Sequence, residues 1–184
     1  MLKIKNHIVV VVLLFLVAGC ATISKEVPDG AKIAADEGLI LATVDLKYLN
    51  TDRKDTPLLE LSYTPENGSP NMAKIFFGSG KEVMLVKAKT GEYVLTHSFF
   101  GFDLMSHRER LKFHVKPGKI TYLGNFTGVV TWPKIGLLSK RRLEVRSQLQ
   151  RDKAVLIKNY PNTERQYAVI DGSHPALLAN EFNK

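Results

Sequence analysis

The sequence predicts a mainly β fold: an antiparallel β-sandwich with one short C-terminal helix, preceded by a signal peptide and a flexible tether. Apolar and polar residues alternate with a period of two in several short segments, and turn-forming Pro, Gly, Asn and Asp separate these segments. Such alternation is typical of half-buried strands, and many short strands divided by turns favour a sandwich. The 184-residue chain has a formal net charge of +8 and no evident repeat or low-complexity tract.

Residues 1–19 have the pattern of a secretory signal peptide. Lys3 and Lys5 form a short basic segment, and the run from Ile8 to Ala18 is apolar and uncharged. This run has 11 residues, whereas a helix that crosses a hydrocarbon core needs roughly 20. We therefore expect a leader that is removed rather than a permanent anchor. Its removal takes both lysines away and lowers the formal net charge from +8 to +6.

The segment Val17-Ala18-Gly19-Cys20 ends the apolar run. An aliphatic residue, two small residues and a cysteine in this order resemble the lipobox of bacterial lipoprotein precursors. Cys20 is the only cysteine of the chain, so it cannot form an internal disulfide, and lipidation accounts for its presence. The alternative is an ordinary signal peptide followed by a chance cysteine, or a buried thiol.

The lipobox resemblance implies cleavage before Cys20 and acylation of that cysteine, with fatty-acyl chains such as palmitate buried in the membrane. Each buried methylene contributes about 0.8 kcal/mol, so more than one chain gives a stable anchor. Ala21 follows the cysteine, in place of the Asp that retains many lipoproteins in the inner membrane. The resemblance therefore implies the bacterial outer membrane, with the domain facing the periplasm.

Residues 20–37 are expected to form the lipidated cysteine and its tether, because Pro28-Asp29-Gly30 interrupts a segment without sustained periodicity. The β-sandwich domain, residues 38–184, is expected to begin with a half-buried strand over 38–48. Further strands are expected over Leu58–Tyr63, Ala73–Phe77, Glu82–Ala88, Tyr93–Phe100, Leu111–Val115, Lys119–Thr127, Leu143–Leu149 and Tyr167–Ile170.

Turn-forming residues define the expected connections. Gly78-Ser79-Gly80 predicts a hairpin between its flanking strands, and Pro117-Gly118 fits a type II turn, in which the glycine takes a positive φ. The segment from Ser106 to Arg110 is expected to be a charged connection. Thr90-Gly91-Glu92-Tyr93 resembles the tyrosine corner of immunoglobulin-like sandwiches, in which the phenol hydrogen bonds to an upstream backbone group.

Asp152 to Tyr160 is the one segment with a helical pattern. Asp152 is a suitable N-cap, because its carboxylate can accept a hydrogen bond from the first free backbone N–H groups. The helix is expected to end at or before Tyr160, since Pro161 disfavours helical geometry in the preceding residue.

Two longer segments, Gly91 to Leu95 and Phe113 to Gly124, resemble small sandwich lipoproteins of unknown function. They share a Gly-x-Tyr strand and then two strands joined by a Pro-Gly turn, the second ending in Tyr-x-Gly. The resemblance implies a transthyretin-like or immunoglobulin-like sandwich, and it carries no catalytic residues.

No motif for chemistry is complete. Gly78-Ser79-Gly80-Lys81 lacks the spacing of a phosphate-binding loop and of a nucleophile elbow. The histidines do not form an H-E-x-x-H pattern or stand beside cysteine, so the sequence predicts no metal site and no cofactor. The histidines considered, which are expected to be exposed or satisfied by hydrogen bonds, are His97, His107, His114 and His174. A hydrolase remains the alternative, and it requires His97, Asp103, His107 and Glu109 to gather in one pocket.

Two surface features have both a structural and a binding interpretation. Lys140-Arg141-Arg142, with Arg146 and Arg151 nearby, forms either a solvated edge or a patch for lipid phosphates and acidic glycans. The loop from Trp132 to Leu138 forms either a cap on the sandwich or a docking loop. Export disfavours nucleic acid as a partner. We therefore expect a non-enzymatic binding or structural module, with an envelope protein or an acidic glycan as its partner.

Overall fold

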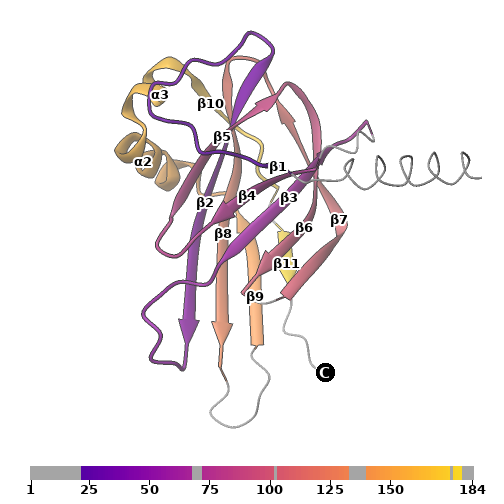
Figure 1. Ribbon diagram of the computed structural model, residues 1–184, viewed down its shortest axis with the longest axis vertical. Coiled ribbons are helices and arrows are strands. Elements are labelled where there is room, and N and C mark those ends of the chain that lie inside the picture. The colour runs from indigo at the N-terminus through magenta and orange to yellow at the C-terminus, as the bar shows by residue number, and fades with distance from the viewer. Residues whose placement is uncertain (1–21, 68–71, 102, 133–139, 175, 180–184) are drawn as a thin grey trace, which may run out of the picture.

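A computed structural model of the protein describes residues 22–67, 72–101, 103–132, 140–174 and 176–179 (Figure 1). Its strands are β1 (Thr22–Ile23), β2 (Glu37–Leu49), β3 (Leu59–Pro65), β4 (Ala73–Phe77), β5 (Val83–Lys89), β6 (Gly91–Phe100), β7 (Asp103–Val115), β8 (Lys119–Thr131), β9 (Lys140–Arg146), β10 (Ala168–Asp171) and β11 (Ala176–Ala179). Its helices are α2 (Leu149–Asn159) and α3 (Pro161–Gln166). The prediction of a mainly β fold with few helices is confirmed.

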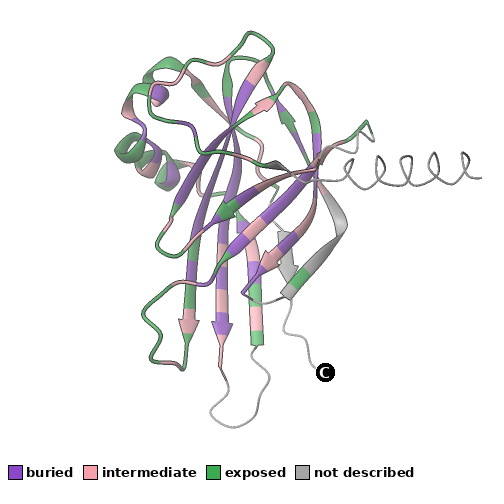
Figure 2. Ribbon diagram, in the orientation of Figure 1, coloured by how far each residue is buried: buried purple, intermediate pink, exposed green. Residues whose placement is uncertain are grey.

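The strands form two sheets that share one hydrophobic core. Sheet A has the strand order β1-β4-β3-β6-β7, and sheet B has the order β11-β9-β8-β2-β5, with β10 also paired to β8. Leu61, Phe77 and Phe100 of sheet A lie in the same buried cluster as Ile40 and Val44 of sheet B. Figure 2 shows the buried positions concentrated along the strands of both sheets. Burial of these alternating apolar side chains is the main stabilising term for such an arrangement.

The expected all-antiparallel pairing is wrong for sheet B. Strands β2 and β8 run parallel from the pair Leu39–Ile120 to the pair Leu49–Thr131, and β10 is also parallel to β8. Between β2 and β8 the chain passes through sheet A twice, and between these two passages β5 pairs antiparallel with β2 in sheet B. Along its other edge, β8 pairs first with β10 and then with β9. Gly124 lies at this change of partner with φ +121°, and a Cβ there would lie 2.6 Å from Cγ1 of Val145.

One predicted hairpin differs from the structure because the chain crosses between sheets. Strand β4 belongs to sheet A and β5 to sheet B, so Gly78-Ser79-Gly80 does not form a hairpin. Gly118 has the positive φ expected of it, +64°, and its turn joins β7 of sheet A to β8 of sheet B. The segment 106–110 is not a connection but part of β7, which pairs with β6. An edge strand tolerates charged residues, which help to prevent further pairing.

Strand β2 is buried on both faces over its first half, so the prediction of a half-buried strand is wrong there. A second hydrophobic cluster covers the face that Leu39 and Leu41 share. Its other buried members come from the N-terminal segment, β5, β8 and the helices, and they are Val27, Val83, Leu85, Ile120, Tyr122, Leu156 and Tyr160. Tertiary packing by α2 therefore overrides the simple alternation of the sequence.

The segment predicted to be a tether packs on the domain in its described part, from Thr22 onward. Thr22 and Ile23 form β1 beside Ala73 and Lys74 of β4. Val27 is buried, and its backbone N–H donates to the carbonyl of Leu85 at 2.8 Å. Apolar burial and backbone pairing hold this segment in place, and a periodicity search does not detect either in an irregular segment.

The predicted helix exists, but it begins earlier. Gln148 is at the N-cap without a side-chain hydrogen bond, and Leu149, expected to end a strand, opens α2. The N-cap assignment of Asp152 is wrong, because its side chain turns into the interior and is fully buried. Tyr160 leaves helical geometry at φ −139°, as predicted, and Pro161 then begins α3. Strand β10 corresponds to the strand predicted over Tyr167–Ile170, and the unpredicted β11 follows it.

Candidate functional site

A groove of about 270 Å³ lies where β2, the turn after β4 and α2 meet. Its lining combines hydroxyls, both signs of charge and aliphatic groups, and consists of Thr43, Val44, Asp45, Leu46, Thr56, Gly80, Lys81, Glu82, Arg151 and Val155. We call it the β2–α2 groove. Such a concave surface with several convergent polar groups is the usual form of a binding site.

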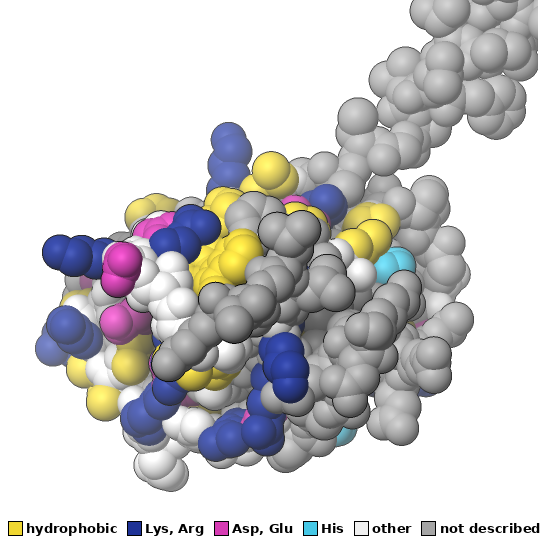
Figure 3. All heavy atoms as spheres, turned by 90° about the horizontal axis from the view of Figure 1, so that it is seen from below, with side chains coloured by type: hydrophobic (Ala, Val, Ile, Leu, Met, Phe, Trp, Pro, Cys, Tyr) yellow, Lys and Arg dark blue, Asp and Glu magenta, His cyan; other side chains and the backbone are white. Residues whose placement is uncertain are grey.

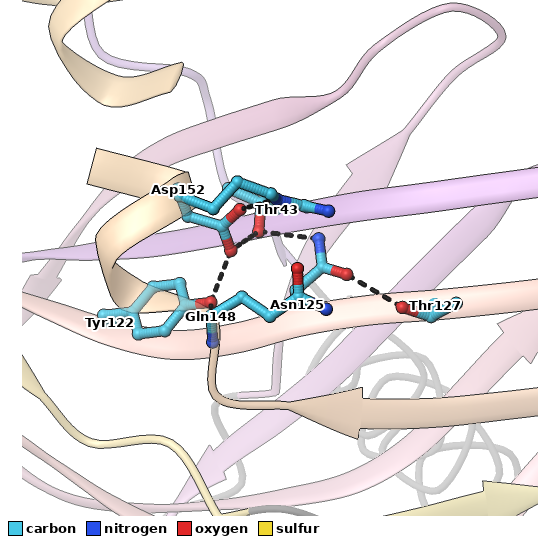
Figure 4. A network of polar contacts seen from close by, with 7 residues as sticks. Thr43, Tyr122, Asn125, Thr127, Gln148 and Asp152 are labelled. Atoms are coloured by element: carbon cyan, nitrogen blue, oxygen red, sulfur yellow. Dashed lines mark hydrogen bonds and ion pairs between the residues drawn. The ribbon is translucent and has the colours of Figure 1, made fainter. Parts of the chain in front are cut away.

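A buried polar network forms the wall behind this groove, and the carboxylate of Asp152 is its centre (Figure 4). Oδ2 of Asp152 accepts a hydrogen bond of 2.5 Å from Oγ1 of Thr43 and another from the hydroxyl of Tyr122. Oδ1 accepts a hydrogen bond of 2.9 Å from Nε of Arg151. Three donors therefore compensate the desolvation of a fully buried carboxylate, as burial of a charge requires.

The network continues along β8. Nδ2 of Asn125 donates to Oγ1 of Thr43 at 3.0 Å, and Oγ1 of Thr127 donates to Oδ1 of Asn125 at 2.8 Å. The backbone N–H of Gln148 donates to the hydroxyl of Tyr122 at 3.2 Å. Burial and then the hydrogen bond to Asp152 raise the pKa of Tyr122. The phenol stays protonated as a donor, and satisfied networks of this kind hold their elements rigidly.

An ion pair between Lys81 and Glu26 lies at the rim of the β2–α2 groove. Nζ of Lys81 contacts both carboxylate oxygens of Glu26, at 2.6 and 2.7 Å. Burial raises the pKa of Glu26, but hydrogen bonds from Lys81 and Tyr160 and the charge of Lys81 outweigh it, so the pKa is lowered. Asp45 and Glu82 are exposed carboxylates on the same rim. The groove therefore offers hydrogen bonding and an acidic edge.

A second groove, of about 310 Å³, lies between β7 and the end of β10. Its lining includes both histidines and lysines and consists of Glu92, Lys112, Phe113, His114, Lys116, Thr121, Ile170, Asp171, Gly172 and His174. His114 is exposed, as predicted, and its Nδ1 contacts Glu92. Lys112 contacts Glu66. Most of these charges are already paired across exposed surface, where ion pairs contribute little.

Neither of the two grooves contains a described residue of the set that the hydrolase hypothesis requires. His97 lies in β6 opposite Ser106 of β7, and it lines neither groove. Asp103, His107 and Glu109 lie in β7, with side chains outside the described part of the structure. Among the described residues, no group of three His, Cys, Asp or Glu side chains is placed to hold a metal ion. Cys20 lies outside the described residues, two positions before β1.

The basic segment Lys140-Arg141-Arg142 opens β9, and Glu144 of the same strand partly neutralises its surroundings. Arg142 contacts Glu144, and Nε of Arg146 donates to Oε2 of Glu144 at 2.7 Å. Figure 3 views the end of the molecule at which β2 and β8 finish, where Lys and Arg side chains surround apolar ones. Arg151 pairs with Asp152 on α2 instead, so it is not part of this patch.

The loop from Trp132 to Leu138 lies outside the described residues except for Trp132. Its backbone N–H donates to the carbonyl of Leu49 at 3.1 Å, and its partly buried ring packs on the core that the two sheets share. That contact agrees with a cap, and the docking alternative stays a prediction.

Comparison with protein-family models, curated proteins and solved structures finds no match to this chain. No helix in the described ranges is long and apolar enough to cross a membrane. The β2–α2 groove is the site that sequence reasoning missed, because Thr43 and Asp152 are 109 residues apart. The available signal was Asp152 itself, a carboxylate one helical turn before the apolar Leu156.

Proposed function

We propose that the protein is a lipid-anchored lipoprotein of the bacterial envelope and that its β domain is a non-enzymatic binding module. Residues 1–19 are removed, Cys20 is acylated, and the domain faces the periplasm from the outer membrane. The lipobox pattern and the lone cysteine support the anchor.

Packing of the chain close to Cys20 supports the anchor. Strand β1 begins at Thr22, two residues after Cys20. The backbone N–H of Ser24 donates to the carbonyl of Lys74 at 2.8 Å, and its hydroxyl hydrogen bonds to that of Tyr63 at 3.0 Å. The chain is therefore packed on the domain within four residues of Cys20, so a lipid on Cys20 would hold the domain close to the membrane.

The two sheets around a common core support a β-sandwich as the scaffold. The hydroxyl of Tyr93 donates to the carbonyl of Lys89 at 2.9 Å, which is the contact expected of a tyrosine corner. The parallel pair of β2 and β8 departs from an immunoglobulin-like arrangement. We therefore propose a sandwich with its own strand order.

The described groups with shifted pKa values suit fixed hydrogen bonding. General acid–base groups need a pKa near the working pH. In the described part of the chain, the shifted pKa values move away from neutral pH. Burial raises the pKa values of Tyr122 and Tyr160, whereas hydrogen bonds lower those of Glu26 and Asp171 despite burial. These groups keep one protonation state at neutral pH, which suits fixed hydrogen bonding.

We propose the β2–α2 groove as the binding site and a polypeptide segment of an envelope protein as its partner. The polar rim of the groove suits a segment that forms hydrogen bonds. The hydroxyl of Thr43 is buried and bonded to Asp152 and Asn125, so it stiffens the wall behind this rim. Asp45 and Glu82 would repel an acidic glycan at the rim. A segment with basic side chains complements these two carboxylates.

Mass spectrometry of the mature N-terminus tests the anchor. We expect a chain that begins at Cys20 and carries acyl groups, and we expect Cys20→Ser to move the protein from the membrane to the soluble fraction. An unmodified Cys20, or a chain that still begins at Met1, contradicts the anchor.

Site-specific photocrosslinking in cells tests the groove. A crosslinker at Asp45 or Glu82 should capture an envelope protein, and one at Asp52, an exposed acid in the following loop, should not. Glu82→Lys should weaken capture through Asp45, because it reverses the charge of the rim. Equal capture through all three positions excludes the groove. Turnover of a broad hydrolase panel by the purified protein would favour the hydrolase instead.

A further inference from the structure

One row of the outer face of sheet A carries large apolar side chains, two of which are exposed. In β4, Ile75 and Phe77 are buried in the core, so Phe76 between them points outward and is 41% exposed. Phe76 lies opposite Glu60 of β3, which lies opposite Phe99 of β6. Phe99 in turn lies opposite Leu104 of β7, which is 68% exposed. The outward row thus has three large apolar side chains in four positions.

A second outward row reaches the edge of the sheet. Ile23 of β1 lies beside Lys74 of β4 and is 64% exposed. The charge of Lys74 is balanced by Glu60, since their side chains form an ion pair of 2.8 Å. The described helices do not cover this face, because α2 and α3 pack with the second cluster on sheet B. Ile23, Phe76 and Leu104 are therefore exposed apolar side chains on one side of sheet A, which makes this side a candidate interaction surface.

The position of this face relative to Cys20 indicates its occupant. Strand β1 is the edge strand of sheet A, and Cys20 precedes Thr22 by two residues. Successive Cα atoms are about 3.8 Å apart, so the Cα of Cys20 lies within roughly 8 Å of the edge of the sheet. If Cys20 is acylated, that edge is held at the lipid headgroups. This step rests on the function proposed above.

We propose that the outer face of sheet A lies on the membrane surface, with Ile23, Phe76 and Leu104 among the lipid headgroups. The row from Phe76 to Leu104 crosses three strand spacings, or about 14 Å, which gives a broad contact rather than a single point. Apolar groups gain free energy at this boundary. The formal net charge of +6 that remains after loss of Lys3 and Lys5 favours anionic headgroups.

Spin labels on the lipidated full chain test this orientation. Acylation consumes the thiol of Cys20, so a cysteine introduced elsewhere is the free thiol available for labelling. Phe76→Cys and Leu104→Cys report on the proposed face, and Ile157→Cys is a matched control on α2, where Ile157 is 46% exposed. The protein is reconstituted in vesicles of phosphatidylethanolamine and phosphatidylglycerol. We expect collisions with a water-soluble nickel chelate to be several-fold less frequent at 76 and 104 than at 157.

The outcomes separate the orientation from the anchor. Protein that does not float with the vesicles contradicts the proposed function itself. Protein that floats, but whose labels at 76, 104 and 157 are equally accessible to nickel, overturns the orientation and leaves the anchor standing. Labels that are shielded in the Cys20→Ser chain without vesicles show a second copy on this face, which also overturns the proposal. The two reporter positions guard against one variant that fails to fold.

Discussion

Oγ1 of Thr43 donates a hydrogen bond of 2.5 Å to Asp152, although the two residues are 109 positions apart. The bond joins β2, an interior strand of sheet B, to the first turn of α2. Because Tyr122 of β8 donates to the same carboxylate oxygen, one buried charge connects three elements. The wall of the β2–α2 groove therefore depends on Asp152, and stability and binding should respond together to its loss.

Asp152→Ala should destabilise the domain by about 3 kcal/mol, because it leaves the buried hydroxyls of Thr43 and Tyr122 without their acceptor. Urea unfolding followed by circular dichroism measures this change. Arg151→Ala is the matched control: Arg151 is the half-exposed partner of the same carboxylate, and we expect a loss of no more than about 1 kcal/mol. Equal losses for the two variants would contradict a role of the network in stability.

Gly128→Ala should destabilise the contact between the sheets by about 2 kcal/mol through overpacking. A Cβ at Gly128 of β8 would lie 2.6 Å from Cζ of Phe100 in sheet A and 2.7 Å from Cδ2 of Leu46. Gly78→Ala is the control, because its Cβ would meet one atom, in the ring of Phe76, at 3.8 Å. Thermal unfolding of the two variants provides the comparison, and similar midpoints would contradict close packing at Gly128.

The positions of several strands were predictable, as for β4, whose predicted bounds match the structure. The pairing of the strands was not predictable, because Gly78-Ser79-Gly80 suits a hairpin as well as a crossing between sheets. The tether prediction failed at Val27, since one apolar residue in an irregular segment has no period, and its burial depends on α2 and β5.

The candidate site could not be predicted from the sequence for a related reason. Asp is a residue type that favours the N-cap position. The burial of Asp152 becomes evident only when β2 and β8 bring hydroxyl donors to it. Sequence spacing gives no measure of contacts between Thr43, Tyr122 and Asp152. Local chemistry was predictable at Tyr93, because its backbone acceptor, Lys89, is four residues away.

Asp29→Ala should loosen the N-terminal segment from the helices. Oδ1 of Asp29 accepts hydrogen bonds of 2.9 Å from the backbone N–H groups of both Asn162 and Thr163, so it caps α3 from a distant part of the chain. Hydrogen exchange should become faster in residues 29–34 and in 161–166, and it should stay unchanged in β6. Asp36→Ala, which removes an exposed ion pair with Lys89, is the control. Unchanged exchange in Asp29→Ala contradicts the cap.

Alkaline pH should destabilise the domain, in part through Tyr63. Burial raises the pKa of Tyr63 to about 12, although a hydrogen bond with Ser24 opposes the shift; an unfolded tyrosine has a pKa of about 10. The raised value means that stability is complete below pH 10 and is lost as the pH rises toward 12, because the unfolded chain then releases a proton that the folded chain keeps. One such group contributes up to about 1.4 kcal/mol per pH unit in this window.

The free energy of unfolding, measured with urea between pH 8 and 11, should therefore fall less steeply with pH in Tyr63→Phe than in the unaltered protein. Ser24→Ala removes the hydrogen bond but keeps the phenol, so it should lower stability at pH 8 and retain the alkaline slope. An unaltered slope in Tyr63→Phe contradicts the assignment.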